Sequence, residues 1–151
     1  MTPEEARQQT IQHIHRVAQL LGVIASEIKR RAVFHDVSKL SAPESEMFAQ
    51  VTETLKRLTY GSEEYEKQRQ QMLGLALGHH YEHNSHHPEH FANGVSGMSL
   101  VDLVEMLCDW RAATERHADG DIHKSIEINT ERFGLSEQLA QIFKNTVSLL
   151  E

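Results

Sequence analysis

The chain has 151 residues, of which 39% are hydrophobic and 25% charged, proportions typical of one globular domain that can bury a core. Its net charge of −7 argues against a face for duplex nucleic acid or an anionic membrane, and no apolar run approaches the roughly 20 residues that span a bilayer. The single cysteine, Cys108, excludes an internal disulfide framework and a cysteine-based zinc site. The acidic start of the chain lacks the apolar core of a signal peptide, so we expect a cytoplasmic protein.

The first two predicted helices fill residues 2–34. Thr2 is a suitable N-cap, Pro3 follows at the first helical position, and apolar side chains recur at helical spacing as far as Leu21. Gly22 is predicted to end this helix, so that a second one runs from about Val23 to Phe34.

Two further helices are predicted in the middle of the chain. Residues 41–44 (Ser-Ala-Pro-Glu) open one that ends near Tyr60-Gly61, and Ser62 caps the next. The second of these continues to Gly78, where a close approach is expected, and six histidines follow within residues 79–90. Residues 84–97 contain a proline and two glycines and are predicted to form a loop.

Three more helices are predicted in the last third of the chain. Ser99 starts one that is amphipathic as far as Trp110, Asp121 caps one that ends at Gly134, and Ser136 opens the last, which runs to Leu150. No alternation of period two indicates a strand. The predicted fold is therefore all-α: one compact bundle of about six or seven helices over residues 1–151.

The pair His35-Asp36 stands at the end of an apolar helical segment. An imidazole and a carboxylate from adjacent residues can bind one divalent ion if the backbone turns so that both side chains point inward. Lys39 would place a fixed cation beside that ion. Such a pair is usually a surface feature. Only the other histidines and acids of the chain favour a metal-binding role for this one.

Other candidate ligands lie on separate predicted helices. His13 and His15 point about 200° apart around their helix, so at most one of them faces a shared site. Near the other end, Asp102, Glu105 and Asp109 form an acidic stripe on one helix face. Asp109 is the best candidate for an inward carboxylate because Cys108 and Trp110 flank it.

Imidazoles and carboxylates that converge in a helical bundle can hold a metal ion. Nitrogen and oxygen ligands without thiolates suit manganese, iron, cobalt, nickel or zinc. Taken singly, each of these histidines is more often a surface or hydrogen-bonded core residue than a ligand.

The order of these residues resembles the HD superfamily of metal-dependent phosphohydrolases. The segment from His13 to Ala18 is similar to that family's first-helix pattern, and residues 35–39 are similar to its His-Asp-x-Gly-Lys segment, with Ser38 in place of the glycine. More narrowly, Pro43-Glu44, Asn84-x-His86-His87 and the segment from Asp102 to Trp110 look like a branch of small bacterial and phage proteins. This narrower resemblance covers about residues 13–148.

The resemblance implies a metal held by four side chains: His13, His35, Asp36 and Asp109. Family members with two metals add histidines from the middle of the chain and let the dyad aspartate bridge both ions. The candidates here are His79 or His80, with His80 preferred, and His86 or His87. These histidines could instead bind phosphate or donate a proton above a single metal.

The implied activity is hydrolysis of a phosphate ester, with a nucleotide as the expected substrate, by water that one or two divalent transition-metal ions activate. Asp36, Lys39 and His80 are the predicted catalytic residues, and Glu46, Glu82 or Asp102 could orient a ligand or act as a base. Two alternatives stay open: a di-iron HD-type oxygenase with the same ligand set, and a non-catalytic module that binds metal or nucleotide.

Overall fold

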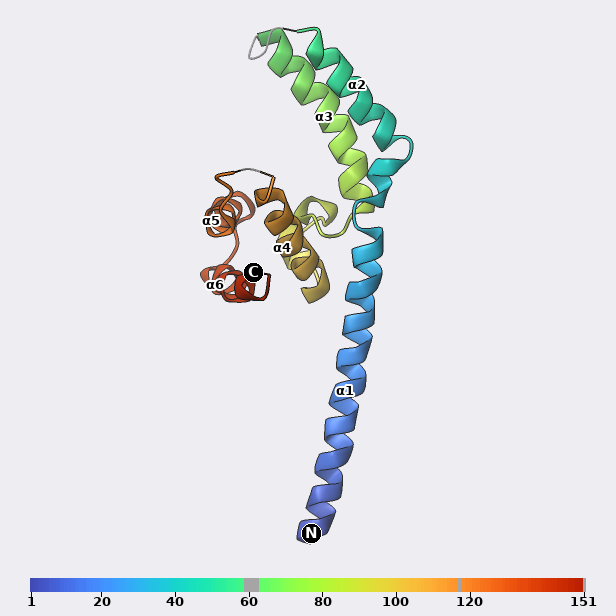
Figure 1. Cartoon of the computed structure of the whole chain (residues 1–151), viewed down its shortest axis with the longest axis vertical. Coiled ribbons are helices and arrows are strands. Elements are labelled where there is room, and N and C mark those ends of the chain that lie inside the picture. Colours follow the sequence, from blue (N-terminus) through green and yellow to red (C-terminus); the bar gives the residue numbers. More distant parts are fainter. Residues whose placement is uncertain (59–62, 117, 151) are drawn as a thin grey trace. The chain divides into compact units, whose positions relative to one another are not determined.

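The computed structural model describes residues 1–58, 63–116 and 118–150, and every regular element in these ranges is helical (Figure 1). The α-helices are α1 (Pro3–Phe34), α2 (Glu44–Lys56), α3 (Glu63–His83), α4 (Leu100–Thr114), α5 (Ile122–Phe133) and α6 (Glu137–Thr146). Four short 3₁₀ turns accompany them: η1 (Val37–Leu40), η2 (Pro88–His90), η3 (Gly94–Gly97) and η4 (Val147–Leu149). The prediction of an all-α fold with about six or seven helices is confirmed. A search of the described helices finds none with the length and apolarity of a membrane-crossing segment.

The chain divides into two units, residues 1–34 and residues 35–151. The first unit is α1, whose start is held by a reciprocal cap: the Thr2 hydroxyl accepts from the Glu5 amide, and Glu5 accepts from the Thr2 amide. The prediction that Gly22 ends the first helix is wrong, because α1 continues through it to Phe34. A helical glycine costs only about 1 kcal/mol relative to alanine, so good helix formers on both sides outweigh it. The prediction of one domain over residues 1–151 stays a prediction.

The second unit begins with two helices, α2 and α3, that lie side by side (Figure 1). Val51 and Ala76 supply their buried apolar side chains. The predicted helix end at Tyr60-Gly61 and the predicted cap at Ser62 lie outside the described residues. Among the described residues, no heavy atom beyond the helix backbone and chain neighbours lies within 4 Å of the Cβ that Gly78 would carry, so they do not use the close approach that this glycine allows.

The main apolar core belongs to α4, α5 and α6. Its buried members are Met106, Leu107, Ile122, Ile126, Leu135, Phe143 and Val147. Trp110 packs on this core between the rings of Phe133 and Phe143, 6.3 and 5.7 Å away. Each aliphatic side chain that is fully buried contributes about 1.5–3 kcal/mol, so this core anchors the helix that carries Glu105 and Asp109.

The predicted caps of these three helices are confirmed. Ser99 forms a reciprocal capping box with Asp102, while Asp121 and Ser136 accept from backbone amides at the starts of α5 and α6. Gly134 ends α5 in the left-handed conformation, at φ 63° and ψ 41°.

Candidate metal centre

The backbone turns sharply between α1 and η1. Asp36 has φ 55° and ψ 13°, the left-handed region that a non-glycine residue seldom adopts and that aspartate and asparagine tolerate best. The helix ends at Phe34, and η1 closes with a bond from the Lys39 amide to the Asp36 carbonyl, 2.9 Å long. This is the turn that a paired use of His35 and Asp36 requires.

The two carboxylate oxygens of Asp36 face different partners. Oδ1 lies 3.3 Å from Nε2 of His80 and 3.5 Å from Nε2 of His86. Oδ2 accepts a 2.7 Å hydrogen bond from Nζ of Lys39 and lies 3.6 Å from Nε2 of His35. One carboxylate therefore adjoins imidazoles from two parts of the chain.

Side chains in this region form three groups whose ligand atoms lie close enough to hold a metal ion, and Asp36 belongs to two of them. The first ligand group is His35, Asp36 and Asp109. The second ligand group is Asp36, His80, His86 and His87. A third set of neighbouring atoms joins His35 and His86 to Glu105.

The histidines of the second ligand group come from the end of α3 and the loop that follows. His80 and His86 are each only 1% exposed. Nε2 of His80 lies 3.0 Å from Nε2 of His87, whose ring also packs against Tyr81 at 5.0 Å. The loop is tied to α4 by a 2.7 Å hydrogen bond from the Ser85 hydroxyl to Asp102.

The first ligand group combines the turn after α1 with α4. Nε2 of His35 lies 3.6 Å from Oδ1 of Asp109, and its Nδ1 lies 2.9 Å from Oε1 of Glu105. Because Glu105 and Asp109 are four residues apart on α4, they share one face of the helix and flank the same ring.

The spacing of these atoms matches the edges of a coordination shell. Ligands about 2.0–2.2 Å from one ion, at tetrahedral or octahedral angles, lie roughly 2.8–3.6 Å from each other. Asp36 Oδ1 and His86 Nε2 are moreover buried without a hydrogen-bond partner among the residues that the structure describes, although they are 3.5 Å apart. Buried polar atoms are rarely left unpaired, and a divalent cation would satisfy both. The residues present fit such an ion.

Neighbouring charges set the protonation of the site. The Asp109 and Glu105 carboxylates raise the pKa of His35 to about 10, against the effect of burial. Burial alone would raise the pKa of the Asp36 carboxyl, but His80 and Lys39 outweigh it and bring the pKa below its usual range. The pKa of Asp109 is lowered in the same way by His35. The carboxylates are thus ionised at neutral pH, and the His35 cation faces them.

His87 differs from the other imidazoles. Burial lowers its pKa to about 4, and repulsion from His86 and His80 acts in the same direction. Its ring is therefore unprotonated at neutral pH, which is the form that binds a metal ion.

A buried carboxylate that the sequence did not single out as a site residue stands behind His80. Glu44 is 0% exposed, and its two oxygens lie 2.8 Å from Nδ1 of His79 and 3.0 Å from Nδ1 of His80. Burial acts to raise its pKa, but hydrogen bonds from His79, Ser38 and His80 lower it. Asn84 completes the arrangement by donating to the Ser38 hydroxyl at 2.9 Å and to the His80 carbonyl at 2.8 Å.

The structure brings together six of the seven residues predicted as metal ligands: His35, Asp36, His80, His86, His87 and Asp109. Between His79 and His80, the side chain of His80 joins the cluster, while His79 bonds to Glu44 and stacks on His83. His13 lies on α1 in the first unit, with an exposed side chain, and its ligand role stays a prediction.

The carboxylates that support the imidazoles are not the three that sequence reasoning suggested. Glu46 and Glu82 are exposed, and Asp102 serves the capping box and the bond to Ser85. Glu44 and Glu105 are the carboxylates that contact ring nitrogens. Glu105 could have been found from its position four residues before Asp109, whereas Glu44 stood out only in the Pro43-Glu44 motif, which gave it no role.

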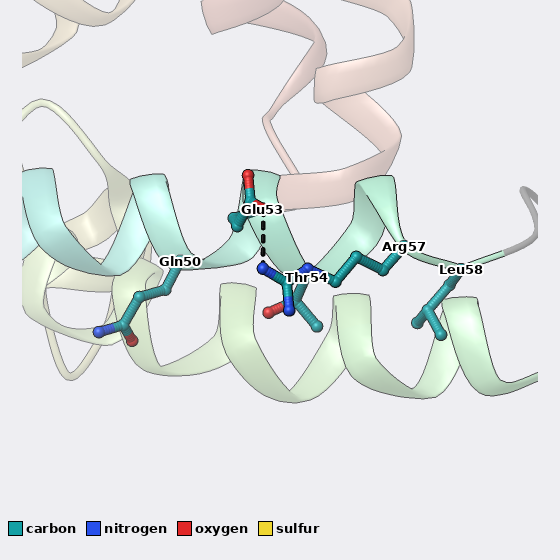
Figure 2. A pocket seen from close by; sticks show the side chains of 5 residues that line it. All are labelled: Gln50, Glu53, Thr54, Arg57 and Leu58. Atoms are coloured by element: carbon teal, nitrogen blue, oxygen red, sulfur yellow. Dashed lines mark hydrogen bonds and ion pairs between the residues drawn. The ribbon is translucent and has the colours of Figure 1, made fainter.

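A surface pocket lies elsewhere, on α2. Figure 2 shows its lining: Gln50, Glu53, Thr54, Arg57 and Leu58. Glu53 and Arg57 form an ion pair of 2.9 Å within it. The pocket shares no residue with either ligand group, so we assign it no part in the metal centre.

Comparison with known proteins places the chain in a family. The model of a family described as "Family of unknown function (DUF5662)" matches residues 2–149, and the chain belongs to this family. The search of curated proteins and the search of solved structures each gave no match.

Proposed function

We propose that the chain is a metal-dependent phosphohydrolase, which cleaves a phosphate ester with the help of one or two divalent transition-metal ions. The observation that carries this proposal is the position of Asp36. Its two oxygens adjoin the imidazoles of two ligand groups. Within the described part of the chain, Oδ1 and His86 Nε2 are buried and have no hydrogen-bond partner. Such a shared carboxylate would hold two ions close together, as two-metal hydrolytic sites do.

His35, Asp36 and Asp109 would hold an ion in the first ligand group, where His35 would give up to solvent the proton that it carries without metal. His80, His86 and His87 would join Asp36 in the second. A bound divalent ion supplies a hydroxide nucleophile at neutral pH, because it lowers the pKa of water from about 16 to about 7 in favourable cases. The buried position of His80 favours a ligand role over proton donation to a substrate.

Lys39 is the residue best placed to bind the phosphate group. Its side chain is 40% exposed while Nζ stays 2.7 Å from Asp36, so a cation stands where the cluster meets solvent. A lysine there would neutralise charge on the non-bridging oxygens and hold the phosphorus in line for attack. A nucleotide remains the proposed substrate class because the HD resemblance implies it.

The test is metal analysis of the purified protein, followed by a screen of phosphate esters with manganese, cobalt or iron added. We expect bound transition metal and release of phosphate or of a phosphorylated product, and both should be lost after chelation. Oxygen consumption without phosphate release would favour the di-iron oxygenase instead, since a shell rich in imidazoles also suits iron. Metal binding without any turnover would favour the non-catalytic module.

A further inference from the structure

We propose that Glu44 and Glu105 are positioning residues that fix which ring nitrogen of the site histidines faces the metal. Glu44 serves the second ligand group alone, and Glu105 serves both groups. This inference rests on the proposed metal centre. It adds that two carboxylates other than the shared Asp36 determine the orientation of the imidazole rings. The two carboxylates act on different parts of the site.

Glu44 favours one tautomer of His80. Carboxylate oxygens accept, so Nδ1 of His80, 3.0 Å from Glu44, is assigned as the donor, although the Asn84 amide nitrogen also lies 3.1 Å from this Nδ1. The neutral ring then carries its lone pair on Nε2, the atom 3.3 Å from Asp36 Oδ1. The Ser38 hydroxyl and His79 bond to the same carboxylate, so Glu44 is held from several sides in a fully buried position.

Glu105 acts on one member of each ligand group. Its Oε1 lies 2.9 Å from Nδ1 of His35 and 3.2 Å from Nδ1 of His86. Nε2 of His35 is thereby directed toward Asp36 and Asp109, and Nε2 of His86 is directed toward Asp36. Oε1 of Glu105 therefore contacts one histidine of each ligand group, whereas Asp36 is itself a member of both groups.

Because Glu44 serves one ligand group and Glu105 serves both, replacing them should affect the two metal positions unequally. Carboxylates that orient ligating histidines typically change metal affinity about 10–100-fold when replaced. Glu44→Gln should weaken only the position that uses His80, because its amide can donate to Nδ1 and disturb the tautomer. Glu105→Gln should weaken both positions. Glu46→Gln is the matched control, since Glu46 lies two residues along α2 and is exposed.

The first experiment needs no metal. Long-range ¹H–¹⁵N NMR of the chelated full chain reports which nitrogen of each imidazole carries the proton. We expect His80 and His86 to be protonated at Nδ1 in the wild type. Glu44→Gln should change the tautomer of His80 and not of His86, and Glu105→Gln should do the reverse. Wild-type rings protonated at Nε2, or the same change in both variants, would overturn the inference.

The second experiment titrates the full chain with Co²⁺, read by calorimetry and by the visible spectrum, with metal content measured by mass spectrometry. We expect Glu44→Gln to raise the Kd of one equivalent about 10–100-fold, Glu105→Gln to raise the Kd of both, and Glu46→Gln to leave them unchanged. Equal shifts at both positions in Glu44→Gln would contradict the proposal. If Glu44→Gln does not fold, Ser38→Ala replaces it, because it removes one hydrogen bond to the carboxylate and should produce a smaller shift at the same position.

The two experiments separate this inference from the proposed function. A wild-type chain that binds no metal refutes the metal-dependent phosphohydrolase, while the tautomers of His80 and His86 still decide whether the carboxylates orient the rings. A wild-type chain that binds metal and hydrolyses phosphate esters, with Kd values unchanged in both glutamine variants, refutes the positioning roles alone.

Discussion

Replacing Asp36 with asparagine removes one negative charge and changes little else. Asparagine has nearly the same shape and also tolerates the left-handed backbone found here at φ 55°. Alanine is the poorer choice, because a non-glycine residue without a short polar side chain adds roughly 1 kcal/mol of backbone strain in this conformation. Asp36→Asn therefore separates the charge of the carboxylate from the geometry of the turn.

The expected loss of metal affinity follows from the position of Asp36, whose two carboxylate oxygens face different ligand groups. Oδ1 lies 3.3 Å from His80, and Oδ2 lies 3.6 Å from His35, so an ion in either ligand group would lie within about 4 Å of this charge. At that distance and an effective dielectric constant of about 20, two unit charges attract by about 4 kcal/mol. We therefore expect divalent-ion affinity to fall at least about 10³-fold at both positions.

Stability without metal should change far less. The ion pair between Asp36 and Lys39 is partly exposed, and such pairs contribute at most about 1 kcal/mol. We would measure metal affinity by calorimetry and unfolding by urea in the presence of chelator. Asp119→Asn, the same substitution at an exposed position, is the control. An Asp36→Asn chain that keeps wild-type metal content and affinity would refute the assignment of Asp36 to the centre.

Three further predictions test other parts of the chain. His13→Ala should lower metal affinity at least tenfold if the HD resemblance holds at this position, and unchanged metal content would remove His13 from the ligand set. Asp102→Ala should lower the free energy of unfolding by about 1–2 kcal/mol, measured by urea titration, because it breaks the capping box of α4 and the bond to the loop. The pKa of His35 is raised from 6.5 to about 10, so its contribution to stability is fully present below pH 6.5 and is lost as the pH rises through 10. The pKa values of Asp36 and Asp109 are lowered from 3.8, so their contributions are present above that pH and are lost as the pH falls further. The pKa of His87 is lowered from 6.5 to about 4, so this ring disfavours the folded state increasingly as the pH falls from 6.5 to 4. The thermal midpoint of the chelated protein should therefore be highest near pH 6.5 and should decline toward pH 10, whereas a midpoint that rises from pH 6.5 to 10 would contradict the charge assignment.

Local rules accounted for the helices wherever a cap made its own hydrogen bonds. Ser99, Asp121 and Ser136 bond to amides two or three residues ahead, and Gly134 adopts the conformation that glycine favours, so each signal is complete within a few residues. The helix end predicted at Gly22 was wrong because a glycine is not a complete signal by itself. A glycine ends a helix only where the chain turns, and here the apolar spacing continues on both sides.

Only the parts of the candidate site that residue types and spacing indicate could be predicted from the sequence. The pair at residues 35–36 and the histidines after α3 stood out because their composition is unusual. The choice between His79 and His80 depended on Glu44, which lies 35 residues before His79 in the chain and contacts both rings. That contact exists only once α2 and η1 lie against α3, so no local pattern in the sequence could have revealed it.

The placement of polar and apolar groups in the second unit gives the cluster a structural role as well. The described apolar core is formed by α4, α5, α6 and the segments that border them, whereas Val51 and Ala76 are the buried apolar side chains among those described in α2 and α3. Polar contacts join the residues next to η1 and α3 to α4: His35 and His86 contact Glu105, and Ser85 donates to Asp102. Buried carboxylates and imidazoles contribute little to stability unless they are fully paired. A cation that satisfied Asp36 and His86 would therefore strengthen the contact between these helices, and metal binding and folding of this unit are expected to be coupled.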